Sequence, residues 1–450
     1  MVECPEHLEL AQLAARRACV LLKNDGLLPL NPDTVGTVGV IGPNANNRTA
    51  LIGNYYGTSS RYITLLEGIQ EAVEGYGRVL YSEGCHLFRE HLSDQGMEGN
   101  GLAEAITVAK HSDVVVLVLG LDETLEGEEG CIDGMEVGDK KDLLLPKSQR
   151  ELMHAVLEVG KPTVVVLMAG SAMDLSEAQE KADAVLLTWY PGAGGGKTVA
   201  DILFGEVSPS GKLPLTFYRN DQLNDMPAFT DYSMKGRTYR YMKSEPLYPF
   251  GFGLSYTNFE YSDIKLSADS IKDTDKVTVS FKIKNTGAVD GAEVAQVYVT
   301  DNESTIFRPK QELKGFKKVF LKAGEEKEVS IELSKRAFAY YNVNIHDWHI
   351  ESGKFTINVG SSSRDIRLSA ELNVESTVEA VIPDYRATAA KYYTADIMDI
   401  KDEEFVAVLG RELPPREIKA YPNLTLVNTI EDSAAGKNGG KIVRLIKKLV

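Results

Sequence analysis

Six carboxylate side chains lie within twelve residues of this chain: Asp122, Glu123, Glu126, Glu128, Glu129 and Asp133. Carboxylates that stand close together repel one another, and this repulsion can raise the pKa of one of them above its ordinary value. A carboxylic acid that keeps its proton near neutral pH can act as a general acid. Composition alone favours a solvated acidic loop, so the catalytic interpretation needs support beyond the number of charges.

The acidic segment follows the most continuous apolar run of the sequence, residues 114–119, which Gly120 closes. An uninterrupted apolar run of this length is typical of a strand buried on both faces of a parallel sheet. Open α/β sheets bind their ligands at the carboxyl ends of the strands. The sequence therefore predicts that the acidic segment lies where a ligand can reach it.

Other apolar runs predict further strands of the same sheet, at 38–41, 163–168 and 184–187. Helical spacing of apolar residues predicts helices at 6–23, 148–159, 175–181 and 197–204. Strands that alternate with helices indicate an α/β fold, and we expect an open, mostly parallel α/β sandwich over residues 1–215.

The second half of the chain changes character. Residues 216–262 are rich in aromatic residues, Gly and Pro and predict a long packed connection. From 263 to 375 apolar residues alternate with polar ones in runs separated by turns, which predicts a β-sandwich. Residues 376–450 form a C-terminal extension, with one short helix expected at 402–410 and a basic end at 437–450.

Several other segments do not meet the patterns of nucleotide-binding, metal-binding or serine-hydrolase sites. The Gly-rich segment 191–198 has Pro191 where a phosphate-binding loop requires Gly, and Lys197 occupies the last Gly position of the dinucleotide pattern. The seven histidines show no ligand spacing; His346 and His349 lie in a predicted turn without a third partner. No Gly-x-Ser-x-Gly elbow occurs. The sequence therefore predicts neither a cofactor nor a metal.

Composition restricts the partners. The formal net charge of −16 disfavours nucleic acid, whereas a neutral sugar is compatible with it. Four cysteines without CxxC spacing favour reduced thiols. No apolar run reaches the ~20 residues of a membrane span, and no signal peptide is visible at the first residues. A cytoplasmic location is expected.

Eight motifs stand in unbroken order along about 370 residues of this chain. They are residues 7–30, Ile41-Gly-Pro-Asn-Ala45, 189–196, 200–205, 209–214, 248–256, 313–316 and 359–365. Their order resembles the C-terminal half of glycoside hydrolase family 3 enzymes, of the β-glucosidase and β-xylosidase type. Residues 7–30 resemble the start of the second domain of these enzymes, and 41–45 the next landmark of the family. Residues 189–214 are similar to the most recognisable stretch of that domain, and 248–256 follow in the expected place. The last two motifs resemble the fibronectin type III-like domain of these enzymes.

This resemblance implies a retaining, exo-acting β-glycosidase that hydrolyses terminal non-reducing β-linked sugars of an oligosaccharide or glycoside. The family's acid/base lies in a Glu-x-Glu-Gly-like loop, which matches residues 126–130; Glu128 is the first choice, with Glu126 and Glu129 as alternatives. The family's Asp-Arg after that loop corresponds to Asp139-Lys140, a departure from the pattern. The loop 54–62 is expected to border the sugar site through Tyr56, Ser60 and Arg61.

The resemblance also implies a nucleophilic Asp, carried in a Ser-Asp-Trp-like motif by an N-terminal (β/α)₈ barrel. Only one Asp-Trp pair occurs here, Asp347-Trp348, and it falls within the predicted β-sandwich. We therefore expect the nucleophile to come from a barrel that this sequence does not contain, as part of a longer or split enzyme or from a partner. The alternative function is a non-catalytic carbohydrate-binding or assembly subunit.

Overall fold

The computed structural model describes residues 3–54, 56–90, 100–127, 130–132, 135–137, 140–226, 234, 236–394 and 400–413. The contacts divide the chain into two units, Met1–Asp384 and Tyr385–Val450. In the described part of the second unit, α9 spans Lys391–Thr394 and α10 spans Asp402–Leu409, close to the expected helix. The basic end at 437–450 lies outside the described residues. No helix among the described residues is long and apolar enough to cross a membrane.

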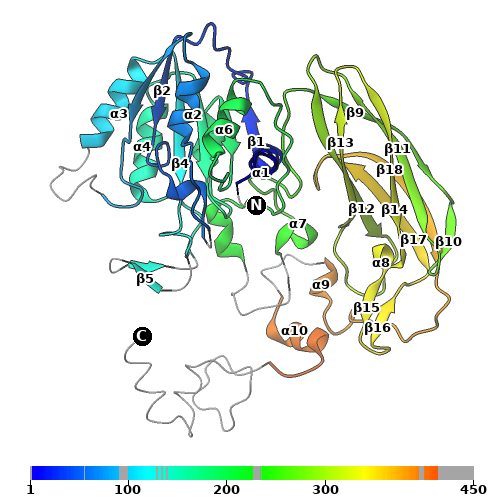
Figure 1. Ribbon diagram of the computed structural model, residues 1–450. Coiled ribbons are helices and arrows are strands. Elements are labelled where there is room, and N and C mark those ends of the chain that lie inside the picture. The colour runs from blue at the N-terminus through cyan, green and yellow to red at the C-terminus, as the bar shows by residue number, and fades with distance from the viewer. Residues whose placement is uncertain are drawn as a thin grey trace, which may run out of the picture. The chain divides into compact units, whose positions relative to one another are not determined.

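In the described part of the first unit, six strands form one sheet in the order β1-β8-β7-β4-β2-β3. All neighbouring pairs are parallel except β1 and β8, which are antiparallel. The expected open, mostly parallel α/β sheet is therefore confirmed (Figure 1). The strands are β1 (Val20–Asn24), β2 (Thr37–Ile41), β3 (Arg78–Ser82), β4 (Val114–Gly120), β7 (Thr163–Met168) and β8 (Ala184–Leu187).

Helices cover both faces of this sheet because alternate strand residues enter two separate apolar cores. Val115, Leu117 and Leu119 of β4 pack in the core that contains residues of α3, α4 and α5. Val114, Val116 and Val118 pack in the core that contains residues of α2 and α6. The helices of this region are α1 (Pro5–Ala18), α2 (Leu65–Ala72), α3 (Asn100–Lys110), α4 (Lys147–Leu157), α5 (Ser176–Lys181), α6 (Gly195–Leu203) and the 3₁₀ helix η1 (Thr49–Leu51).

The helix predicted over residues 6–23 was wrong at its C-terminal end. Helix α1 stops at Ala18, and Val20–Asn24 form strand β1. Val20, Leu21 and Leu22 are buried against the sheet, whereas none of the fourteen residues of α1, all of them described, is buried. The apolar residues after Ala18 therefore gain more burial as an edge strand paired with β8 than as two further turns of a surface helix.

The second region of the first unit is a β-sandwich whose two sheets share one apolar core. Over the described residues, one sheet has the order β10-β18-β17-β12-β13 and the other β14-β11-β9. Its strands are β9 (Phe259–Leu266), β10 (Ser270–Lys272), β11 (Val277–Asn285), β12 (Gly291–Asp301), β13 (Glu312–Leu321), β14 (Glu326–Leu333), β17 (Gly353–Gly360) and β18 (Ile366–Glu375). The hairpin β15 (Tyr340–Asn342) and β16 (Asp347–His349) follows the short helix α8 (Lys335–Phe338). Asp347-Trp348 therefore lies within the sandwich region, as expected, on a strand of this separate two-stranded hairpin.

The connection between the two regions packs on both of them. Phe217 and Tyr248 are buried in one core of the α/β region, and η2 (Asn220–Asp225) and α7 (Thr238–Tyr241) lie between them in sequence. Tyr239 of α7 stacks on Phe250 at 4.4 Å between ring centroids, and its hydroxyl accepts a hydrogen bond from the Leu313 amide at 2.9 Å. The aromatic residues of this segment thus serve packing.

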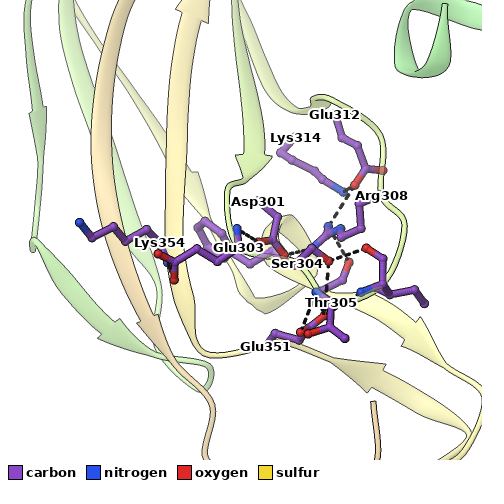
Figure 2. Close-up of polar contacts among 12 residues, drawn as sticks. Asp301, Glu303, Ser304, Thr305, Arg308, Glu312, Lys314, Glu351 and Lys354 are labelled. Atoms are coloured by element: carbon purple, nitrogen blue, oxygen red, sulfur yellow. Dashed lines mark hydrogen bonds and ion pairs between the residues drawn. The ribbon is translucent and has the colours of Figure 1, made fainter. Parts of the chain in front are cut away.

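A network of partly buried charges holds the loop between β12 and β13 (Figure 2). Arg308 binds Asp301 at 3.0 Å and Glu312 at 3.1 Å, and it also donates to the Phe338 carbonyl at 2.6 Å. Glu312 is bound by two further cations, Lys314 at 3.3 Å and Arg240 of α7. We call Asp301, Arg308, Glu312, Lys314 and Arg240 the Arg308 network.

Candidate active site

The acidic segment begins at the carboxyl end of β4 with a turn built around Asp122. Only 5% of the surface of Asp122 is exposed, and one of its carboxylate oxygens accepts hydrogen bonds from the amide and hydroxyl of Thr124, at 3.0 and 2.6 Å. The other oxygen accepts from Asn47 at 3.4 Å and from the Thr49 hydroxyl at 3.3 Å. Asp122 thus fixes the start of the segment against the loop that follows β2.

The next carboxyl, Glu123, is in a different environment. Its Oε2 atom is buried and has no hydrogen-bond partner among the described residues. Burial, and to a smaller extent the charge of Asp122, raises the pKa of Glu123 above its ordinary value. Repulsion from a neighbouring carboxylate therefore raises a pKa, as the sequence suggests, but in Glu123, which was not among the candidates for the general acid/base.

Glu126 connects the ends of three strands. Its Oε2 atom accepts hydrogen bonds from the Gly170 amide, at 2.7 Å, and from the Tyr190 hydroxyl, and its Oε1 atom accepts from the Ser171 hydroxyl. Gly170 and Ser171 follow β7, whereas Tyr190 follows β8. We call Glu126, Gly170, Ser171 and Tyr190 the Glu126 cluster.

Tyr190 donates to a carboxylate from a partly buried position. Burial, followed by the charge of Glu126 and by their hydrogen bond, raises the pKa of the Tyr190 hydroxyl far above its ordinary value. The phenol therefore keeps its proton and remains a donor to Glu126 over the range in which proteins are folded.

Beyond Glu126 the chain forms the short antiparallel hairpin of β5 (Gly130–Ile132) and β6 (Met135–Val137), which projects beyond the sheet (Figure 1). Glu128, Glu129 and Asp133 lie outside the described residues, so Glu128 and Glu129 stay predictions. Lys140 follows the hairpin, and its Nζ atom lies 2.6 Å from Sδ of Met173. Burial lowers the pKa of Lys140, and the charges of Glu126 and Asp142 oppose this shift.

The loop that we expected to border a sugar reaches the acidic segment through Asn54, whose side chain donates to the Glu126 carbonyl at 2.6 Å. Arg61 points to α2, where it pairs with Glu67 at 2.6 Å, and the Ser60 amide donates to Glu3 at 2.8 Å. The Tyr56 side chain is 48% exposed. The loop thus contacts the acidic segment through Asn54, and no contact of Tyr56, Ser60 or Arg61 with that segment is found among the described residues. The substrate-binding role of these three residues stays a prediction.

Sequence reasoning missed the residues that hold Glu126. Ser171 and Tyr190 stand 45 and 64 positions away in the chain. The available signal was their position directly after two buried apolar runs, because the carboxyl ends of parallel strands meet at one edge of the sheet. Among the described residues, no group of three or more His, Cys, Asp or Glu side chains could hold a metal ion.

Comparison with known proteins gives matches over both regions. A family model described as the glycosyl hydrolase family 3 C-terminal domain matches residues 19–256, and a fibronectin type III-like domain model matches residues 293–363. Together these matches cover most of the first unit.

Individual relatives agree with these models but are longer. The chain is 40% identical over 393 residues to the thermostable β-glucosidase B of Acetivibrio thermocellus, covering 83% of this chain and 49% of that protein. It is 38% identical to a β-xylosidase of Formosa agariphila, covering 80% and 49%. The crystal structure of a β-glucosidase from Bifidobacterium adolescentis superposes with a TM-score of 0.74 at 32% identity, covering 98% of this chain and 58% of that one. The chain thus spans about half the length of the curated relatives that it matches.

Proposed function

The chain belongs to glycoside hydrolase family 3, and we propose that it supplies the general acid/base of a retaining, exo-acting β-glycosidase. The observation that carries this proposal is the acidic segment itself, which begins at the carboxyl end of β4 within the matched family domain. Carboxyl ends of strands are where open α/β sheets bind ligands. The β-glucosidase and β-xylosidase names of its relatives support a substrate with a terminal β-linked sugar.

Glu128 is the proposed acid/base, and Glu129 and Glu126 are the alternatives. In the first step the carboxylic acid protonates the glycosidic oxygen that leaves, while a nucleophilic carboxylate attacks the anomeric carbon and forms a covalent glycosyl intermediate. In the second step the same residue, now ionised, takes a proton from the water that hydrolyses the intermediate. Tyr56, Ser60 and Arg61 are proposed to border the sugar.

The nucleophile is proposed to come from a (β/α)₈ barrel domain that lies outside the sequence studied. The greater length of the relatives is consistent with such a domain. The only Asp-Trp pair of the sequence is on β16, in the hairpin that lies within the stretch matched by the fibronectin type III-like model.

The test is complementation in trans. We expect the purified chain alone to hydrolyse aryl β-glucosides negligibly, and turnover to start when a folded barrel domain from a family 3 β-glucosidase is added. Glu128→Gln should then lower turnover by roughly 10²–10⁴-fold, the usual contribution of a general acid/base. Glu371→Gln, an exposed carboxyl on the sandwich, is the matched control and should leave turnover unchanged.

Two outcomes would contradict the proposal. Robust turnover by the chain alone, retained in Asp347→Asn, would mean that the nucleophile is present after all. Binding of oligosaccharide without turnover, even with the barrel bound, would favour the non-catalytic carbohydrate-binding or assembly subunit.

A further inference from the structure

We propose that Glu126 is a positioning residue: with Ser171 and Tyr190 it fixes one end of the acid-bearing segment to the ends of β7 and β8, while Lys140 fixes the other end. This inference rests on the proposed function for the role of the segment, but the contacts that it invokes belong to the chain alone. Glu126 is one of the three candidates for the general acid/base, and the positioning role distinguishes it from Glu128 and Glu129.

The hydrogen bonds of Glu126 favour this role because they occupy both carboxylate oxygens. Ser171 donates to Oε1, whereas Gly170 and Tyr190 donate to Oε2. A hydroxyl can rotate and become an acceptor, but the Gly170 amide can only donate. A proton on Oε2 would therefore point at the N–H group of Gly170, which cannot accept it. For Oε2 to deliver a proton to a sugar, its hydrogen bonds with Gly170 and Tyr190 would have to break.

The cluster is also closely packed around the Tyr190 ring. A Cβ atom on Gly170 would lie 3.0 Å from Cε2 of Tyr190 and 3.2 Å from Oε2 of Glu126. A Cβ on Gly53, which has a positive φ of 64°, would lie 2.8 Å from Cδ2 of the same ring. Backbone from two segments thus packs against the Cδ2–Cε2 edge of the ring and restricts the direction in which its hydroxyl donates.

The other end of the segment contacts the same stretch of chain. Lys140 contacts Met173 and is attracted by the charge of Glu126, and three residues later the Leu143 carbonyl accepts a hydrogen bond from the Asp174 amide at 2.7 Å. Residues 170–174 therefore bind the segment both before and after the β5–β6 hairpin. Glu128 and Glu129 stand between these two attachments in sequence.

A consequence for catalysis follows from this arrangement. A misplacement of a catalytic group by about 1 Å can cost roughly 100-fold in rate. Loss of the Glu126 contacts should therefore slow the chemical step although the acid itself remains. Substrate binding should change less, because no contact of the Glu126 cluster requires the sugar.

The first experiment uses the chain alone and measures hydrogen exchange of the backbone amides over residues 122–140. We expect Glu126→Gln, Tyr190→Phe and Ser171→Ala to increase exchange in this segment at least several-fold and to leave the sandwich unchanged. Ser171→Thr keeps the hydroxyl and should restore protection. Tyr76→Phe, which alters a tyrosine that is 62% exposed, is the matched control. Unchanged exchange in both Glu126→Gln and Tyr190→Phe would overturn the proposal.

The second experiment adds the barrel domain and measures kcat, KM and their pH dependence. Glu126→Gln should lower kcat by about 10–100-fold with little change in KM, and the alkaline limb of the pH profile should remain because the acid is still present. Loss of that limb in Glu126→Gln would instead identify Glu126 as the acid/base and overturn the positioning role.

The two experiments fail independently. If the wild-type mixture shows no turnover while hydrogen exchange responds as expected, the proposed function is wrong and the positioning contacts stand. If turnover depends on Glu128 but exchange is insensitive to Glu126, the function stands and the positioning role is wrong.

Discussion

The Arg308 network of the β-sandwich and the Glu126 cluster of the α/β region are both centred on carboxylates, but their charges are balanced differently. Glu312 binds three cations, and Asp301 shares one of them. Glu126 is held by one amide and two hydroxyls, within a segment that carries five other carboxylates. The first arrangement sets three cations against two carboxylates, whereas Glu126 accepts its hydrogen bonds from neutral groups and attracts the charge of Lys140.

The pKa shifts depend on the balance between burial and nearby cations at each carboxyl. In Asp301, which pairs with Arg308, burial outweighs the cation and the pKa is raised. Burial alone would raise the pKa of Glu312, but Lys314, Arg240 and Arg308 outweigh it and the pKa is lowered. Glu123 has its pKa raised by burial and, to a smaller extent, by the charge of Asp122. A carboxyl that remains ionised stabilises the fold, whereas one with a raised pKa is suited to proton transfer. The lowered pKa thus fits a structural role for Glu312, whereas a raised pKa, which Asp301 and Glu123 share, does not by itself mark a candidate site.

The largest effect is expected from Arg308→Ala. The substitution removes the cation that the Asp301 and Glu312 carboxylates share, at a site where the Arg308 side chain is only 8% exposed. The sandwich should therefore lose about 3–5 kcal/mol of unfolding free energy. The chain has two tryptophans, Trp189 in the α/β region and Trp348 in the sandwich. Urea unfolding followed by Trp348 fluorescence in a Trp189→Phe background assigns the loss to the sandwich. An unchanged midpoint would mean that the network contributes nothing to stability.

A smaller, pH-dependent effect is expected from Glu312→Gln. Because the folded pKa of Glu312 is lowered, its contribution is fully present above the unfolded pKa of about 4.3 and is lost as the pH falls through the folded value. The variant should therefore be less stable than the wild type by about 2 kcal/mol at pH 7, the usual contribution of a hydrogen bond to a charged group, and the two should converge in acid. Urea midpoints between pH 7 and pH 3 measure this, and a constant difference across the range would contradict it.

Tyr190→Phe should cost less, about 1 kcal/mol of unfolding free energy, because the Gly170 and Ser171 hydrogen bonds to Glu126 remain. The loss should be visible at Trp189 and not at Trp348. Unfolding of a Trp348→Phe background measures it, with Tyr76→Phe as the control. A loss as large as that of Arg308→Ala would remove the distinction between the two clusters.

The smallest effect is expected from Lys276→Ala on the sandwich surface. Lys276 pairs with Glu332 at 2.7 Å, but both side chains are more than half exposed, so water and salt screen the attraction. The unfolding free energy should change by less than about 0.5 kcal/mol. This variant shows whether burial, rather than the presence of an ion pair, distinguishes the Arg308 network.

The sequence was most informative where the pattern was local. The apolar runs at 114–119 and 163–168 predicted β4 and β7 because strands buried on both faces need no polar alternation. Residues 20–23 were placed wrongly in a helix because their spacing continues that of α1, and only pairing with β8 decides between the two structures.

The contacts of the candidate site could be predicted only in part, because they join distant segments. Strand order brings residues 170 and 171 beside Glu126, and local spacing carries no information about that order. Arg240 and Glu312 likewise meet only because α7 packs against the sandwich. The position of the acidic segment at a strand end follows from the sequence, whereas the donors that hold it do not.

The antiparallel edge strand β1 has a consequence for the order in which the protein is made. Val20 pairs with Leu187 of β8, so the first strand of the sheet cannot find its partner until the ribosome has added β8. At about 5–20 residues per second, the synthesis of the chain from β1 to β8 takes roughly 10–30 s. During this time the backbone N–H and C=O groups of an apolar strand remain unpaired. The nascent chain is therefore expected to need protection at residues 20–24 by a chaperone, and the sheet to close only after synthesis has passed β8.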